Sequence, residues 1–254
     1  AAQENLEEVS ALKIRIKFAK KGTMKFIGHL DIMRYFQKVM RRADVDIRYS
    51  EGFSPHQIMS FAAPLGVGIT SKGEYVDIEV LDTENSKKMI DRLNAVMSEG
   101  FEILEYKLLP DDAANAMSIV AAADYSLTFR PGYEPENESP QEWFEKLVQF
   151  FDTDHVMIMK KTKKGEREMD LKPFVYELKV RKEGEIPALF MKVSAGSAAN
   201  IKPELVLDAY YTSLEEERPQ FAFMTEREEV YADAATAEEA EAGTHKFVTL
   251  GNLG

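Results

Sequence analysis

Two of the four histidines lie within residues 25–65, where side chains able to move protons are densest. His29 and Asp31 fall at the start of a predicted helix, and His56 follows Tyr49 in a loop that contains glycine and proline. Imidazoles ionise near pH 6.5, so two of them in one cleft could act as the general acid and base of a metal-independent ribonuclease. With the Asp31 carboxylate they could instead bind a divalent ion. The sequence equally allows a structural role, in which His29 caps its helix and His56 binds loop backbone.

Basic side chains surround these histidines, although the chain as a whole is acidic. The net charge is −12, yet eleven basic and three acidic residues between Lys13 and Arg48 give that window a net charge of +8. A partner within the Debye length of about 8 Å meets this local charge. The residues predicted to contact nucleic-acid phosphates are Lys20, Lys21, Lys25, Arg34, Lys38, Arg41 and Arg42, with a second cluster at Lys160, Lys161, Lys163 and Lys164. Tyr35, Tyr49 and Phe53 are aromatic groups that could stack on bases.

Several enzyme classes are excluded by residues that the chain lacks. It has no cysteine, so it cannot supply a thiolate nucleophile, a cysteine-ligated zinc or an iron–sulfur cluster. No phosphate-binding Walker loop, dinucleotide-binding turn, zincin helix or hydrolase elbow occurs. We therefore predict no cofactor and no metal site, and the pattern favours a binding module over an enzyme. No apolar run approaches about 20 residues and no signal-peptide pattern is present, so we expect a cytoplasmic protein without membrane contact.

The elements that would position the histidines follow a β-α-β-β-α-β order over residues 12–110. Residues 12–19 alternate apolar and basic side chains, which is typical of a half-buried strand. A helix is predicted over 29–43, a strand over 44–50 with extended structure resuming over 57–62, a strand over 74–81, a helix over 83–97 and a strand over 101–109. This order predicts a ferredoxin-like unit with an antiparallel sheet and both helices on one face.

A second unit of similar size is predicted over residues 123–214. It follows a linker at 111–122 and has the same kinds of element with one additional strand, including a helix from Ser139 to Phe151 and another from Pro203 to about Leu214. Residues 1–11 and 215–254 are rich in acidic side chains, so we expect two acidic tails, the C-terminal one partly disordered. The predicted fold class is thus α+β, with two ferredoxin-like units.

Two long segments resemble the bacterial radical-SAM-linked domain family, whose function is unassigned. They are KFIGHLDIMRYFQKVMRRA and YSEGFSPHQIMSFAAPLGVGITSKGEYVDIEV, and KGEREMDLKPFVYEL is a weaker match. The resemblance implies signature positions at His29, Asp31, Arg34, Tyr49, Ser50, Gly52, Phe53, Pro55 and His56, and Ser54 completes the loop signature. Gly28 departs from the serine expected before the HLD triplet. The resemblance further implies a radical SAM protein as the partner that would carry the cluster and the cofactor.

The leading hypothesis from the sequence is an accessory module that recognises RNA, or a substrate containing RNA, for that radical SAM partner. One alternative is a metal-independent endoribonuclease that uses His29 and His56. The other is a protein-interaction domain that does not bind nucleic acid and whose acidic tail binds a basic partner.

Overall fold

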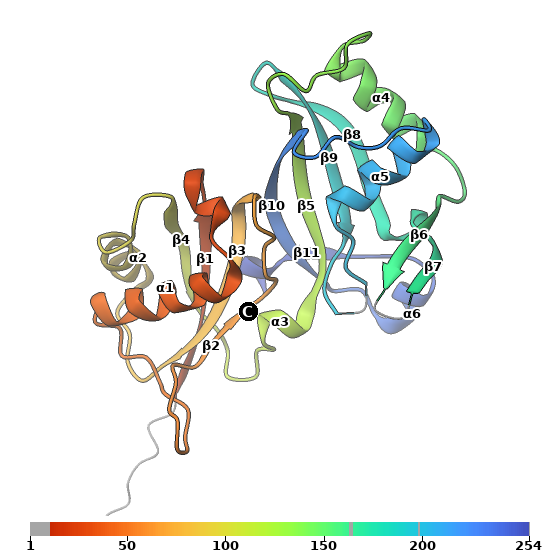
Figure 1. Cartoon of the computed structure of the whole chain (residues 1–254). Helices are drawn as coiled ribbons and strands as arrows, with labels where there is room; N and C mark the ends of the chain where they lie inside the picture. Colours follow the sequence, from red (N-terminus) through yellow and green to blue (C-terminus); the bar gives the residue numbers. More distant parts are fainter. Residues whose placement is uncertain (1–10, 163–164, 198, 254) are drawn as a thin grey trace, which may run out of the picture.

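The computed structural model describes residues 11–162, 165–197 and 199–253, and within these ranges a single nine-stranded sheet runs through both halves of the chain. Its strand order is β4-β1-β3-β10-β5-β9-β8, with β2 beside β3 and β11 beside β10. Figure 1 shows the N-terminal half, coloured red to yellow, next to the C-terminal half, coloured green to blue. The predicted α+β class is confirmed, but the two units share a single sheet.

The N-terminal unit has ferredoxin-like topology. Its strands are β1 (Leu12–Lys20), β2 (Met59–Phe61), β3 (Thr70–Val80) and β4 (Phe101–Leu108), and its helices are α1 (His29–Arg42) and α2 (Ser86–Asn94), with a 3-10 turn at Gly22–Phe26. The order β4-β1-β3-β2 is antiparallel at every pairing. Ile14, Ile16 and Phe18 of β1 are buried against Phe36 of α1, as the alternating pattern predicts.

The C-terminal unit repeats this strand order as β10-β5-β9-β8. Its main elements are β5 (Val120–Phe129), α4 (Pro140–Phe150), β8 (Val175–Glu183), β9 (Ile186–Ser194), α5 (Pro203–Ser213) and β10 (Phe223–Asp233). A hairpin of β6 (Met157–Thr162) and β7 (Gly165–Asp170), followed by a 3-10 turn at Lys172–Phe174, is inserted after α4. Ser139 and Glu142 form a capping box at α4, which explains why that helix begins where the sequence predicts.

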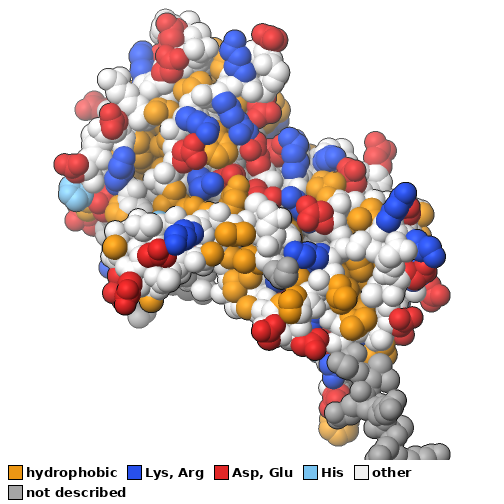
Figure 2. Space-filling view, turned by 180° about the vertical axis from the view of Figure 1, so that it is seen from behind, with side chains coloured by type: hydrophobic (Ala, Val, Ile, Leu, Met, Phe, Trp, Pro, Cys, Tyr) orange, Lys and Arg blue, Asp and Glu red, His pale blue; other side chains and the backbone are white. Residues whose placement is uncertain are grey.

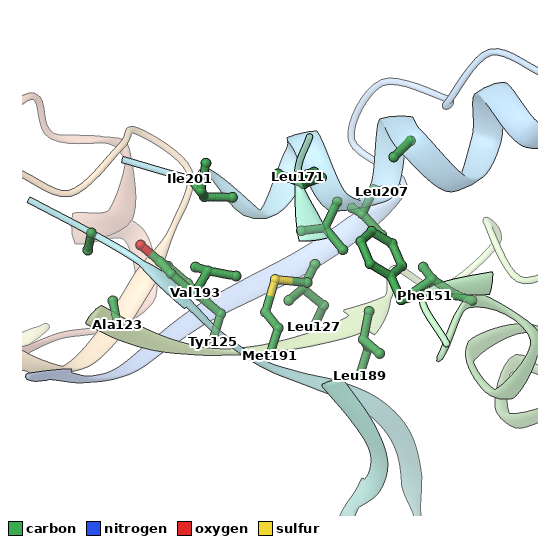
Figure 3. Packing of buried hydrophobic residues seen from close by; sticks show 14 of the residues in the cluster. Ala123, Tyr125, Leu127, Phe151, Leu171, Leu189, Met191, Val193, Ile201 and Leu207 are labelled. Carbon is green, nitrogen blue, oxygen red and sulfur yellow. The ribbon is translucent and has the colours of Figure 1, made fainter. Parts of the chain in front are cut away.

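Separate cores support the two halves. One cluster lies under α1 and α2, and the other lies between β5, β9 and the helices α4 and α5. Figure 3 shows a portion of the second cluster, where Leu127, Leu189 and Met191 face Phe151 and Leu207. The halves are joined where β10 runs parallel to the start of β3, with Arg227 opposite Ser71. The junction therefore depends on residues far apart in the sequence.

Three predicted boundaries are wrong. Residues 44–50 contribute only isolated bridges, Ile47 to Val80 and Tyr49 to Gln57. The predicted linker 111–122 holds the short helix α3 (Ala116–Ile119) and the start of β5, because the Asp77 carboxylate accepts a hydrogen bond from the Ala116 amide and holds this segment on the sheet. The predicted acidic tail contains β10, α6 (Ala237–Glu241), β11 (Phe247–Thr249) and a 3-10 turn at Leu250–Asn252.

The C-terminal segment is bound to the sheet by buried contacts. Val230 and Ala232 of β10 are almost fully buried, and the fully buried Leu250 accepts a hydrogen bond through its carbonyl from the Arg15 guanidinium at 3.1 Å. A loose acidic arm would leave these apolar groups in water, which explains why the segment folds back. Among the described residues, no helix has the length and apolar character needed to cross a membrane.

Candidate functional site

The basic face of α1 carries four of the predicted site residues and is exposed to solvent. Ile32, Phe36, Val39 and Met40 bury one face of α1, so the opposite face points to solvent. That exposed face carries Arg34, Lys38, Arg41 and Arg42.

Few of these four charges are neutralised within the chain. Arg34 is 72% exposed and only weakly paired with Asp31, at 3.4 Å. Arg42 donates a long hydrogen bond of 3.5 Å to the Val96 carbonyl. Lys38 and Arg41 have no ion-pair partner within the described ranges of the chain. The face is therefore open to an anionic partner.

A projecting loop, residues 49–57, lies beside this face. Its base is closed by the bridge between Tyr49 and Gln57, and the Ser50 amide donates to the His56 carbonyl at 2.8 Å. The Gln57 side-chain amide donates to the Gln37 carbonyl of α1 at 3.2 Å, which anchors the loop to the helix. Figure 1 shows this loop in orange, extending beyond the sheet below α1.

The tip of the loop presents an aromatic ring to solvent. Gly52 has a φ of +104°, which a residue with a side chain rarely adopts, and it turns the chain so that Phe53 is fully exposed. Ser54, Pro55 and His56 are exposed beside it. We call the basic face of α1 together with the loop tip the α1–loop surface; its residues are Arg34, Lys38, Arg41, Arg42 and 49–56.

The two histidines do not share a cleft. The His29 ring packs edge-on against Phe61, with centroids 5.4 Å apart, whereas His56 Nδ1 lies 2.8 Å from Ser50 Oγ. Gln57, next to His56, contacts α1 at Gln37, which is eight residues and about 12 Å along the helix from His29. This geometry does not support paired acid–base catalysis by His29 and His56.

His29 instead belongs to a partly buried setting at the start of α1. Burial lowers its pKa from the ordinary value near 6.5, an effect that the nearby Glu74 carboxylate opposes. The N-cap of α1 is Gly28, and no side chain caps the helix, so the predicted capping role of His29 is not observed.

This pKa shift predicts a measurable pH effect. His29 binds a proton less readily in the folded protein than in the unfolded chain, whose histidines titrate near pH 6.5. As the pH falls through this range, protonation therefore favours the unfolded chain, and His29 should reduce stability. Compared with His29→Gln, the wild-type protein should therefore lose more of its unfolding midpoint between pH 7.5 and pH 5.5. Thermal unfolding at both pH values measures this, with His56→Gln as the exposed control. Parallel pH dependence of wild type and His29→Gln would contradict the shift.

Lys20 does not belong to a binding surface. It is fully buried, and its ammonium group donates to the Ile27 carbonyl at 3.1 Å. Burial lowers its pKa; Glu74 opposes this effect and Arg227 adds to it. The prediction for Lys20 is therefore wrong. The signal was in the sequence, because Lys20 continues the even-numbered positions Ile14, Ile16 and Phe18 that face the core.

A charge pair next to Lys20 was not predicted from the sequence. Arg227 binds Glu74 through two hydrogen bonds, Nε to Oε1 at 2.8 Å and Nη2 to Oε2 at 2.5 Å, and both side chains are almost fully buried. Burial by itself would lower the pKa of Arg227, but the Glu74 carboxylate and the adjacent Tyr125 raise it above its ordinary value. This pair joins β3 to β10 and so joins the two units.

The remaining predicted cations do not belong to the α1–loop surface. Lys21 is paired with Glu102 at 2.7 Å, and Lys25 lies over the Phe26 ring. Lys160 is half-buried on β6, which Figure 1 places in the C-terminal unit, away from α1. The Lys161 side chain, Lys163 and Lys164 lie outside the described residues.

The face opposite to the helices has a different character. Figure 2 shows it with Lys and Arg side chains interspersed among Asp and Glu. Many of these charges are paired across strands, as Lys17 is with Glu229 at 2.7 Å. Mixed and paired charges give little net attraction for a polyanion, so the α1–loop surface remains the stronger candidate.

Comparison with known proteins gives several structural similarities, of which two are described here, and one family. The chain is 13% identical to a chain in the crystal structure of a Cbf5-Nop10-Gar1 complex, with a TM-score of 0.42, and the match covers 85% of this chain and 48% of that one. It therefore spans about half the length of that chain. The chain is also 10% identical to an unknown protein from Galdieria sulphuraria, with a TM-score of 0.24. That match covers 86% of this chain and 98% of the other. No curated protein matches.

The family match covers most of the chain. Residues 13–203 match the family described as an uncharacterized protein conserved in bacteria (DUF2344). This range includes the whole α1–loop surface and ends at the start of α5. The chain therefore belongs to this bacterial family of uncharacterised proteins.

Proposed function

We propose that this protein is an accessory module that recognises RNA through the α1–loop surface and acts with a radical SAM protein. The observation that carries RNA recognition is the placement of unneutralised cations on α1 next to a loop that exposes Phe53 completely. Cations attract the phosphate backbone, and an exposed ring offers a platform for an unpaired base. This combination suits single-stranded RNA better than a duplex, whose bases are already stacked.

The radical SAM partner is proposed from the resemblance of residues 25–43 and 49–80 to the radical-SAM-linked domain family. Because this chain has no cysteine, the partner would hold the iron–sulfur cluster and carry out the chemistry. In this arrangement the present chain binds the RNA substrate.

Replacing Phe53 by alanine tests the contribution of the loop tip. Stacking of a base on an aromatic ring contributes about 1–3 kcal/mol, so Phe53→Ala should weaken the binding of single-stranded RNA about 5- to 150-fold. Its unfolding midpoint should not change, because the ring makes no buried contacts. Fluorescence anisotropy with labelled single-stranded RNA measures the affinity. Phe221→Ala, which removes a ring 65% exposed in the C-terminal unit, is the matched control and should bind like wild type. Equal affinity of wild type and Phe53→Ala would contradict a role for the loop tip.

A further inference from the structure

A cavity of about 440 Å³ lies where the two units meet. Its walls come from residues 62–69 before β3, from Tyr125 on β5, from the loop between β9 and α5, and from Arg227 on β10. Its volume falls within the range of about 300–1,000 Å³ that is typical of small-molecule sites. The α1–loop surface contributes no residue to this cavity.

One wall of the cavity is cationic and polar. Lys202 is exposed at the N-cap of α5, makes no side-chain cap there, and lines the cavity together with Ser197 and Asn200. The Arg227 guanidinium, only 4% exposed, also lines the cavity, although the Glu74 carboxylate offsets most of its charge. The positive end of the α5 dipole adds to this potential. An anionic group on a ligand would be stabilised at this wall.

The loop that forms this wall is held in position by Gly196. Its φ is +100°, and a Cβ added there would collide with the Val120 carbonyl at the start of β5. The loop can therefore approach β5 closely only with glycine at this position. Figure 3 shows the neighbouring Tyr125 with its hydroxyl oxygen directed away from Leu127 and Met191, out of the apolar cluster.

Another part of the lining is apolar and could pack against a planar ring. Ala62, Leu65, Val67 and Ile69 line it, and Met117 of α3 closes one side. Glu204, on the polar side, has a buried Oε2 atom with no hydrogen-bond partner among the described residues. Such an atom can accept a hydrogen bond from an amino or hydroxyl group of a ligand, which would remove the cost of leaving it unpaired.

We propose that this cavity binds a nucleotide, with its base against the apolar wall and its phosphate near Lys202 and Arg227. The phosphate matches the cationic part of the lining, and the planar base matches the apolar part. The donor groups of base and ribose match the unpaired Glu204 oxygen. The nucleotide could be free in solution or an unpaired nucleotide within RNA, and the two sources have the same recognition chemistry. The proposal does not depend on RNA binding at the α1–loop surface.

Isothermal titration of the full chain tests the proposal with two probes. Nucleoside 5′-monophosphates represent the free ligand, and single-stranded tetranucleotides represent the ligand within RNA. For at least one of the four bases, the monophosphate or the tetranucleotide should bind saturably. The nucleoside of that base, which lacks the phosphate, should bind about tenfold more weakly or not at all. Tighter binding of the tetranucleotide than of the monophosphate would identify RNA as the source, and the reverse would identify a free nucleotide.

Charge reversal at Lys202 tests whether the nucleotide binds in this cavity. Lys202→Glu should weaken the phosphate-bearing probe about tenfold or more, and Lys202→Arg should retain most of the affinity. Lys87→Glu, on the exposed face of α2, is the matched control and should bind like wild type. Because Lys202 is exposed, neither variant should change the unfolding midpoint. The proposal is overturned if no nucleotide binds, if Lys202→Glu binds as wild type does, or if inorganic phosphate competes as well as the nucleotide.

Failure of this proposal would leave the proposed RNA recognition intact. Replacing Arg34, Lys38, Arg41 and Arg42 by alanine should not change the affinity for a free monophosphate, because these residues do not line the cavity. Loss of RNA binding in that variant with unchanged monophosphate binding would therefore separate the two sites.

Discussion

Replacing Glu74 by alanine should destabilise the protein by about 3–5 kcal/mol, because it leaves a buried arginine without its counter-ion. Glu74 accepts two hydrogen bonds from Arg227, and the two side chains are only 7% and 4% exposed. Lys20, also fully buried, is a second cation that the Glu74 charge stabilises. The substitution would therefore leave two positive charges in the interior with no ion pair to a carboxylate within the described part of the chain.

The same substitution should loosen the junction between the units. Arg227 also donates to the Ala63 carbonyl at 2.5 Å, so its guanidinium holds the segment before β3 as well as β3 itself. The pairing of β3 with β10 is short, with only Glu226 opposite Thr70 and Arg227 opposite Ser71 in register. The buried ion pair thus acts at this junction together with more exposed polar contacts to β10, such as Lys17 with Glu229 and Lys72 with Glu226.

Urea unfolding followed by circular dichroism measures the expected loss. Glu79→Ala is a matched control on the same strand, because Glu79 pairs with the 42% exposed Arg48 at 2.9 Å and should contribute at most about 1 kcal/mol. The double variant Glu74→Leu/Arg227→Met should recover much of the stability by replacing the pair with apolar side chains. A loss for Glu74→Ala no larger than that for Glu79→Ala would contradict this account of the junction.

Local periodicity was enough to predict the N-terminal unit. The alternation in β1 and the helical spacing of Ile32, Phe36 and Val39 in α1 each reflect burial on one face, which a short window of sequence records. The ferredoxin-like order followed from these elements. Residues 44–50 were predicted as a strand, but only isolated bridges, Ile47 to Val80 and Tyr49 to Gln57, form there.

The join between the units could not be predicted in this way. β10 reads FMTEREEVYAD, in which charges occupy positions on both faces and suggest a solvated segment. The strand is stable because Arg227 finds Glu74 across the sheet, 153 residues earlier in the chain, and Tyr231 donates to the Asp124 carboxylate at 2.6 Å. Pairings at such sequence separation leave no trace in local hydrophobic patterns.

Only the features of the candidate site that depend on local sequence were predicted, because contacts between distant segments leave no local pattern. The polar face of α1 is a local feature of helical spacing, and Arg34, Lys38, Arg41 and Arg42 lie on the surface. The pattern did not predict whether Phe53 is exposed, and the structure places its ring in solvent. Whether His29 and His56 meet depends on how the loop packs on α1, which the sequence leaves open. The cavity between the units was not foreseen, because its walls come from segments separated by more than 100 residues.

Removing the four cations of α1 should have the largest effect on RNA binding. The quadruple alanine variant at Arg34, Lys38, Arg41 and Arg42 should bind single-stranded RNA about 100-fold more weakly at low salt, because each lost phosphate contact also removes the release of a counter-ion. The fold should be unaffected, since these side chains are exposed and the buried face of α1 is unchanged. A control with the same change in charge replaces Lys146, Lys179, Lys182 and Lys246, which are exposed outside the α1–loop surface.

The salt dependence of RNA affinity, measured side by side for wild type, the quadruple variant and its control, tests RNA recognition by the α1–loop surface most directly. For wild type the logarithm of the association constant should fall linearly with the logarithm of salt concentration. In the quadruple variant the slope should be smaller by about 3, as expected for four phosphate contacts on a single strand, and the control should keep the wild-type slope. Absent or salt-independent binding by wild type, or equal slopes for wild type and the quadruple variant, would contradict the account.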